Sequence, residues 1–212
     1  MRSEPEPNAD TEPNADTESV AALSSAPTRP APAVTTGGVA AVLVPVLIGA
    51  AVAVALGAFG RLHEPQFFSV SVAGFSSGTA VKSWLATLAV TLAIFQLVSA
   101  FIMYRLTPRG RAPKWIGTAH VWSGRLAVLA SVPVAVHCLY ALGFQSGDTR
   151  VLFHSLFGCF FYGVFVTKMM LLTRKNLRPW VIPIAGGLLF FVLVYVWLTS
   201  ALWFFDTTGV TF

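Results

Sequence analysis

The amino-acid sequence predicts an all-α membrane protein with five transmembrane helices, a four-helix core plus one N-terminal span, behind a disordered N-terminal tail. Hydrophobic residues make up 55% of the 212 residues and charged residues only 11%, with a mean hydropathy of +0.71. This balance is typical of proteins that reside in a bilayer. The apolar residues are also gathered in long windows, and half of the Lys and Arg residues lie in two short stretches between windows. That distribution is expected of a multi-pass topology.

The first 37 residues differ from the rest of the chain. They are rich in Pro, Glu, Asp, Ala and Thr and contain a tandem hexapeptide, Glu-Pro-Asn-Ala-Asp-Thr, at 6–11 and 12–17. Such a segment lacks the apolar surface needed to offset its ordering entropy. Because it is acidic and long, it does not resemble a cleaved signal peptide. We therefore expect a disordered cytoplasmic tail over 1–37 and a transmembrane domain over 38–212.

The transmembrane domain contains apolar windows that match the thickness of a bilayer. A helix needs about 20 residues to cross a hydrocarbon core of roughly 30 Å, and in lipid its backbone groups must be satisfied within the segment. Pro45, Pro133 and Pro183 fall in or near these windows and predict kinks, because membrane helices tolerate proline. The predicted spans are 39–60, 83–104, 117–142, 152–172 and 180–205.

The loops predict the orientation in the cytoplasmic membrane. Loops rich in Lys and Arg remain cytoplasmic, which predicts a cytoplasmic N-terminus and an extracytoplasmic C-terminus for five crossings. Tryptophans at window ends support these boundaries, because indole rings favour the membrane interface. The basic loop residues are Arg105, Arg109, Arg111, Lys114, Arg174, Lys175 and Arg178, and the tryptophans are Trp84, Trp115, Trp180 and Trp203.

Two other classes of function are disfavoured. The net charge of +5 comes from these loops rather than from one soluble basic face, so nucleic-acid binding is not expected. Cys138 and Cys159 lie far apart in apolar windows without a C-x-x-C pattern. They are interpreted as small buried hydrophobic residues rather than as a disulfide or metal site.

Ionisable residues inside the predicted spans are candidates for function, because their burial in lipid is costly. His137 and His154 fall at similar depth on consecutive antiparallel helices. Two neutral imidazoles at one level provide the axial ligands of a b-type haem. Gly158, one turn after His154, leaves room for a porphyrin, and Arg150 is placed to pair with haem propionates. The alternative is two helix-end histidines that bond to backbone or water.

The other end of the same span carries His120 and Arg125. His120 lies 17 residues before His137, which on an ideal helix is roughly 25 Å of rise and about 100° of rotation, so the two rings do not share a face. The interpretation favoured here is that His120 and Arg125 contact headgroups or the basic loop. A second haem on His120 would need an unusual methionine partner from Met103, Met169 or Met170.

The connection after the first span has two features. His63 lies beside Glu64 and is predicted to be solvated, with a metal or quinone site as the minor alternative. The stretch 66–80 carries no charged residue and is too short to span the membrane as a helix. It is expected to form an interfacial segment or a short hairpin.

From about residue 82 to 205 the chain resembles an uncharacterised actinobacterial multi-pass membrane protein family of unknown function, which is itself similar to cytochrome b561-like and ferric-reductase-like transmembrane domains. The resemblance implies a haem-binding electron carrier, with His137 and His154 as the natural ligands and His120 as a weaker one. A second histidine pair, typical of b561 proteins, is missing here. The matching segments are His-Val-Trp-Ser-Gly-Arg (120–125), Pro-Val-Ala-Val-His-Cys-Leu-Tyr (133–140), Asp-Thr-Arg-Val-Leu-Phe-His (148–154), Gly-Cys-Phe-Phe-Tyr-Gly (158–163) and Leu-Thr-Ser-Ala-Leu-Trp-Phe-Phe (198–205).

The function predicted from the sequence is therefore electron transfer at a bis-His haem b near the outer face. Its partner is expected to be a quinone or an unknown redox protein, since no flavin or nicotinamide motif is present. The chain has no catalytic motif of its own. The main alternative is a cofactor-free structural or scaffold subunit. A proton-coupled transporter has little support, because no Asp or Glu lies in a predicted span.

Overall fold

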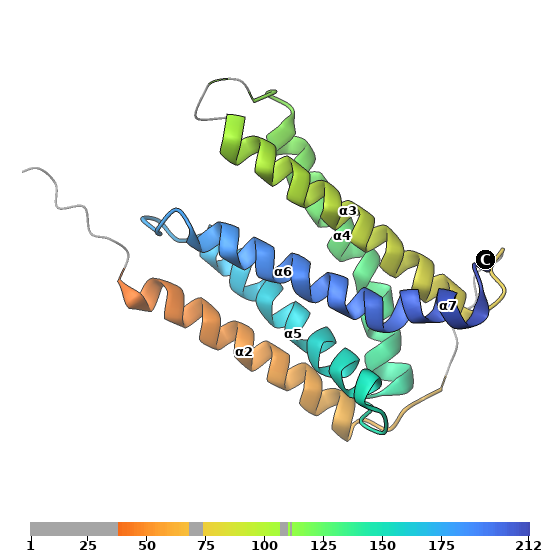
Figure 1. Cartoon of the computed structure of the whole chain (residues 1–212). Coiled ribbons are helices and arrows are strands. Elements are labelled where there is room, and N and C mark those ends of the chain that lie inside the picture. The colour runs from red at the N-terminus through yellow and green to blue at the C-terminus, as the bar shows by residue number, and fades with distance from the viewer. Residues whose placement is uncertain (1–37, 68–73, 107–109, 111) are drawn as a thin grey trace, which may run out of the picture. The chain divides into compact units, whose positions relative to one another are not determined.

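The computed structural model describes residues 38–67, 74–106, 110 and 112–212, which form helices joined by short connections (Figure 1). In this part of the chain, five helices are long and apolar enough to cross a membrane. Each has at least 24 residues, which gives about 36 Å at 1.5 Å per residue, more than a bilayer core requires. The predicted fold class is confirmed. The spans are Val39–Leu62, Gly78–Arg105, Ile116–Leu142, Thr149–Leu172 and Val181–Thr208.

Two of the spans are composite. A π-helical segment ends the third span, and a second one interrupts the fifth. The largest difference from the predicted windows is at the second span, whose helix begins at Gly78 rather than near residue 83. The predicted tail and part of the predicted 66–80 segment lie outside the described residues. The elements are α2 (Val39–Leu62), α3 (Gly78–Leu106), α4 (Ile116–Val136), η2 (His137–Leu142), α5 (Thr149–Leu172), α6 (Val181–Trp197), η3 (Leu198–Leu202) and α7 (Trp203–Thr208).

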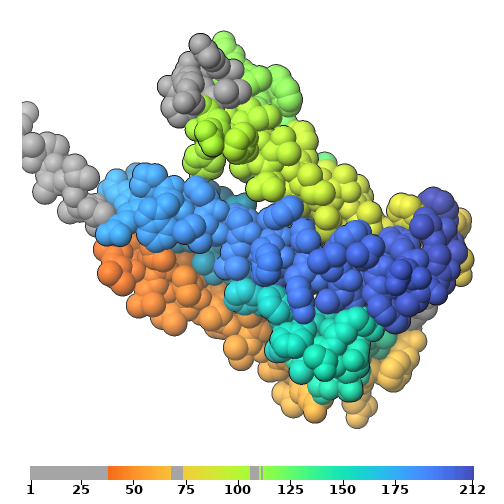
Figure 2. Space-filling view, viewed as in Figure 1, coloured from red at the N-terminus to blue at the C-terminus, as the bar shows by residue number. Residues whose placement is uncertain are grey.

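Helix pairing follows the chain order only in part, because α3 pairs with α4 and α5 with α6, whereas α4 and α5 are not main partners. The helix α4 packs mainly on α3, whereas α5 packs on α2 and α6, and α6 also contacts α3 (Figure 1). The surface of α6 therefore lies between those of α3 and α2 in Figure 2. The helices that carry His137 and His154 were expected to be direct partners. Instead, each packs mainly on other helices.

Apolar side chains hold the helices together at two places. Where α3, α5 and α6 meet, the buried residues Val90, Phe161 and Val192 form part of one core, to which Ala93 and Leu193 also belong. A second core joins Leu171 of α5 to Val181 and Ala185 of α6, and Val42 of α2 packs against it. The helices α5 and α6 therefore contribute to both cores.

The span α2, which is the N-terminal span predicted outside the four-helix core, packs closely against α5. A Cβ atom built on Gly163 would lie 2.5 Å from the Gly49 carbonyl oxygen and 2.9 Å from Ala53 Cβ. The Thr167 hydroxyl lies 3.2 Å from the Pro45 carbonyl oxygen. Glycines at such a crossing allow two backbones to approach, which is how membrane helices gain dispersion contacts.

The π-helical segment η2 organises the connection that follows α2. The backbone N–H groups of Gln66 and Phe67 donate to the carbonyl oxygens of Tyr140 and Ala141, at 3.3 and 3.0 Å. The wider turn of a π-helix frees such carbonyls, and π-helical turns are frequent at functional sites. Pro133 lies in the turn before η2, where a proline was predicted to kink the span.

The C-terminus is attached to the start of α3. The indole N–H of Trp84 donates to the Thr211 carbonyl oxygen at 2.9 Å, and the Phe212 ring stacks on Trp84 at a centroid distance of 4.6 Å. The end of the bundle that carries these residues and the 143–148 connection is called the C-terminal end below. Trp115 and Trp180, which directly precede α4 and α6, are more than half exposed at the other end, as their predicted interfacial position requires.

Candidate functional site

A cavity of about 310 Å³ lies between α3, the α4–η2 span, α5 and the α6–η3–α7 span, in the half of the bundle toward the C-terminal end. Three of the predicted site residues line it, namely Arg150, His154 and Gly158. The other three, His120, Arg125 and His137, are not among its lining residues. The four helices around the cavity correspond to the predicted four-helix core.

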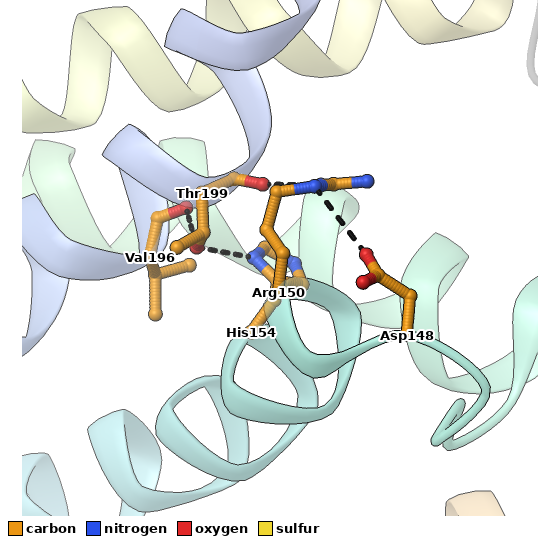
Figure 3. A network of polar contacts seen from close by, with 5 residues as sticks. All are labelled: Asp148, Arg150, His154, Val196 and Thr199. Carbon is orange, nitrogen blue, oxygen red and sulfur yellow. Dashed lines mark hydrogen bonds and ion pairs between the residues drawn. The ribbon is translucent and has the colours of Figure 1, made fainter.

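His154 is oriented by a hydroxyl group on the neighbouring helix (Figure 3). Its Nδ1 atom lies 3.1 Å from Thr199 Oγ1. The Thr199 hydroxyl donates its single hydrogen to the carbonyl oxygens of Tyr195 and Val196, at 2.9 and 3.1 Å. Because a hydroxyl has only one hydrogen, Thr199 must accept from His154, so we infer that Nδ1 carries the proton. The Nε2 atom of a neutral ring then keeps its lone pair.

Arg150 is held by the same threonine through its backbone. One guanidinium nitrogen donates to the Thr199 carbonyl oxygen at 2.6 Å, and the guanidinium carbon lies 4.0 Å from the centroid of the Trp203 ring. The carboxylate of Asp148 is 3.8 Å from Arg150 Nε, and its side chain is 62% exposed, so this ion pair contributes little. Arg150 therefore places a positive charge on the wall of the cavity.

Lys82 adds a second positive charge to the same wall. The predicted apolar window begins at residue 83, directly after Lys82. The observed α3 begins five residues earlier, at Gly78, and brings Lys82 onto the helix. No Asp or Glu is found among the described residues that line the cavity, so the cavity favours a ligand with an acidic group.

Away from the two cations, the cavity contains a hydrogen-bonded pair that links α4 to α5. Ser131 Oγ donates to the Val128 carbonyl oxygen at 2.8 Å and lies 3.0 Å from the Tyr162 hydroxyl oxygen. The serine hydrogen is used by the backbone, so Tyr162 is the donor in this pair. Cys138 and Cys159 also line the cavity, and both are free thiols.

His137 is buried, with only 7% of its surface exposed, but it lies in η2 on a different face from the cavity wall. Its neighbours Val134, Ala135, Cys138 and Leu139 line the cavity. Since His137 directly precedes Cys138, its side chain projects roughly a quarter turn or more away from that face. The azimuth of His137, which only the structure could provide, is not toward the cavity.

His120 forms a polar cluster between α3 and α4, toward the other end of the bundle. Its Nδ1 atom lies 2.8 Å from Ser99 Oγ, and Ser99 donates to the Gln96 carbonyl oxygen at 3.0 Å. The Gln96 amide donates to the His120 carbonyl oxygen and to Ser123 Oγ. As with His154, we infer an Nδ1–H tautomer. Arg125 lies outside this cluster, over the ring of Trp122 at 5.2 Å.

His63 is packed rather than solvated. Its ring stacks on Phe59 at a centroid distance of 5.0 Å and lies 4.3 Å from the Tyr140 ring. The prediction that His63 is solvated was wrong, because η2 brings Tyr140 against the end of α2. The sequence around His63 does not reveal this contact. Across the described part of the chain, no group of three or more His, Cys, Asp or Glu residues is placed to hold a metal ion.

Several residues of the cavity were not predicted, namely Lys82, Ser131, Tyr162 and Thr199. The sequence contains one signal for the hydroxyl residues in this set, namely that each lies inside an apolar window. Such residues bond to another helix or to a backbone carbonyl. Their convergence on one cavity depends on the pairing of α3 with α6 and of α5 with α6, which the sequence does not encode locally.

Comparison with known proteins identifies the family of this chain, and that family has no assigned activity. Residues 42–212 match a family of unknown function, DUF6529, so the chain belongs to this family. No curated protein and no solved structure matches the chain.

Proposed function

We propose that this member of the DUF6529 family is a membrane-embedded electron-transfer protein that holds a b-type haem in the four-helix cavity, with His154 as an axial ligand. The observation that carries the proposal is the hydrogen bond between His154 Nδ1 and Thr199 Oγ1. A ligating histidine almost always donates its other ring N–H to a fixed acceptor, which orients the ring and sets the tautomer. Thr199 supplies such an acceptor.

The cavity has further properties that suit this group. Its volume of about 310 Å³ is at the lower end of the range for cofactor sites. A Cβ atom built on Gly158 would meet nothing within 4 Å, so the wall next to His154 is open. Lys82 and Arg150 would pair with the propionates, and a bound haem would supply one-electron chemistry.

The second axial ligand distinguishes two forms of the proposal. The bis-His form expected from the sequence requires η2 to rotate until His137 reaches the cavity wall. Without that rotation, His154 is the one histidine on the wall among the described residues. The two forms predict different spectra, because two histidines give a six-coordinate low-spin haem and one histidine leaves a five-coordinate haem unless another side chain binds.

The test is the reduced-minus-oxidised visible spectrum of protein purified in detergent from haem-replete cells. We expect a b-type α-band that is lost in His154→Ala. In His137→Ala, conversion to a high-spin spectrum would identify the bis-His form, and an unchanged spectrum would identify the form with one histidine. His120→Ala is the matched control and should retain the band. Colourless wild-type protein would refute the proposal, and a pyridine-haemochrome count of two haems would assign a second site to His120.

The second candidate is the cofactor-free structural subunit. It is favoured by one observation, that both His120 and His154 are hydrogen-bonded through Nδ1 to a hydroxyl of a neighbouring helix. Such bonds are sufficient to explain a histidine that only joins helices. In that case the protein is colourless, added haem leaves its thermal stability unchanged, and His154→Ala and His120→Ala lower that stability to a similar extent.

A further inference from the structure

A groove runs along the outside of the bundle between α2 and α5, on the side of their close contact that faces the C-terminal end. The two helices touch at Gly49 and Gly163 and leave a space of about 700 Å³ beyond it. The α2 side of the groove includes the small residues Ala53, Gly57 and Ala58 together with Val54. On the α5 side, Phe157 and Phe160 form its wall. The groove is therefore shallow, apolar and open to lipid.

Arg61 is the one charged residue among the described residues that line this groove. It lies in the last turn of α2, one turn after Gly57, and its side chain is exposed. None of the hydrogen bonds or ion pairs found among the described residues involves Arg61, and the one ion pair within 4 Å is that of Arg150 with Asp148. An apolar groove that ends at an uncompensated cation complements an amphiphile with an acyl chain and an anionic head.

We propose that the α2–α5 groove is a phospholipid site, in which one acyl chain lies along Ala53 and Gly57 and the lipid phosphate pairs with Arg61. A second copy of the chain is a poorer occupant. In a two-fold symmetric dimer the same face meets itself, so two Arg61 side chains would approach without an acidic partner in the groove. This proposal is independent of haem binding.

The groove also adjoins the internal cavity. Phe144 and Cys159 line both spaces, so they form the partition between the bilayer and the cavity that contains His154. An acyl chain in the groove would pack on the outer side of this partition. The lipid would then exclude water from that wall and keep the cavity apolar, which favours any redox group or ligand that needs a dry site.

The test is native mass spectrometry of the detergent-purified protein after exchange into phosphatidylglycerol or phosphatidylcholine, with the number of retained lipids as the readout. Gly57→Leu should fill the groove without displacing backbone, because a Cβ there meets only Cys159 Sγ at 4.0 Å. Ala58→Leu is a second filling variant. Gly187→Leu is the matched control, since Gly187 is exposed on α6 with nothing within 4 Å of a built Cβ and lines neither space.

We expect the wild-type protein and Gly187→Leu to retain one phosphatidylglycerol, and both filling variants to lose it. Arg61→Gln should lower the preference for phosphatidylglycerol over phosphatidylcholine about fivefold, as expected for one basic group near an anionic headgroup. Arg61→Lys should keep the preference. Equal retention in wild type and Gly57→Leu, an unchanged preference in Arg61→Gln, or a wild-type dimer that Gly57→Leu converts to monomer without loss of lipid would each overturn the proposal.

Discussion

His154 Nδ1 on α5 lies 3.1 Å from the Thr199 hydroxyl oxygen, and this hydrogen bond joins the candidate site to the fifth span. Thr199 lies in η3, the π-helical segment of that span, and its backbone carbonyl also accepts a hydrogen bond from Arg150. One residue thus positions both the imidazole and the guanidinium on the cavity wall (Figure 3).

The first prediction concerns Thr199→Val, which removes the hydroxyl and keeps the shape of the side chain. If His154 is a haem ligand, the affinity for haem should fall by about 10–100-fold, the usual cost of removing such a partner, while the fold is retained. Haem titration followed by absorbance measures this. Thr207→Val is the control, because the Thr207 hydroxyl bonds to the Trp203 and Phe204 carbonyl oxygens in an exposed position. Equal affinity in wild type and Thr199→Val would argue against the role of this bond.

The second prediction concerns the contact between α2 and α5. Gly163→Ala places a Cβ atom 2.5 Å from the Gly49 carbonyl oxygen, so the helices must separate. We expect a loss of about 1–3 kcal/mol in the free energy of unfolding, typical of overpacking, measured by denaturant titration in detergent micelles. Gly117→Ala should be close to neutral, because a Cβ there meets nothing within 4 Å. A neutral Gly163→Ala would show that α2 does not depend on this contact.

The third prediction compares the losses of stability caused by two substitutions in the His120 cluster. Ser99→Ala removes, at a fully buried position of α3, the hydroxyl that lies 2.8 Å from His120 Nδ1, which should cost about 1–3 kcal/mol. Gln96→Leu removes a donor, but Ser123 still donates to the His120 carbonyl oxygen, so the loss should be about 0.6 kcal/mol, the average for such bonds between membrane helices. Thermal unfolding in detergent gives the order. The reverse order would mean that Ser99, and not His120, is the donor in their bond.

The fourth prediction tests the orientation given by the basic loops. In a background with both native cysteines replaced by alanine, Gly147→Cys and Lys114→Cys place single thiols at exposed positions at opposite ends of the bundle. A membrane-impermeant maleimide should label Gly147→Cys in intact cells and Lys114→Cys only after permeabilisation. Labelling in the opposite pattern would place the C-terminal end in the cytoplasm and invert the topology.

Sequence and structure contributed differently to the spans and to the site. The five spans follow from the lengths of the apolar windows and are confirmed, with α2 beginning at Val39 as predicted. The second apolar window was predicted to begin at residue 83, whereas α3 begins at Gly78 and includes Lys82. Charge pattern alone does not distinguish a lysine in a loop from one on the first turns of a membrane helix, because a long side chain can reach the interface from either position.

The sequence by itself determined that this protein resides in a bilayer, which segments cross it, and that His137 and His154 lie near the same end of the bundle. These properties depend on hydropathy and on the rise per residue, which are local. Only the tertiary structure decided that His154 lines the four-helix cavity together with Lys82, Arg150 and Tyr162, and that His137 does not. Azimuth around a helix depends on which helices pack together and on the wider turn of η2, and both arise from contacts between residues far apart in the chain.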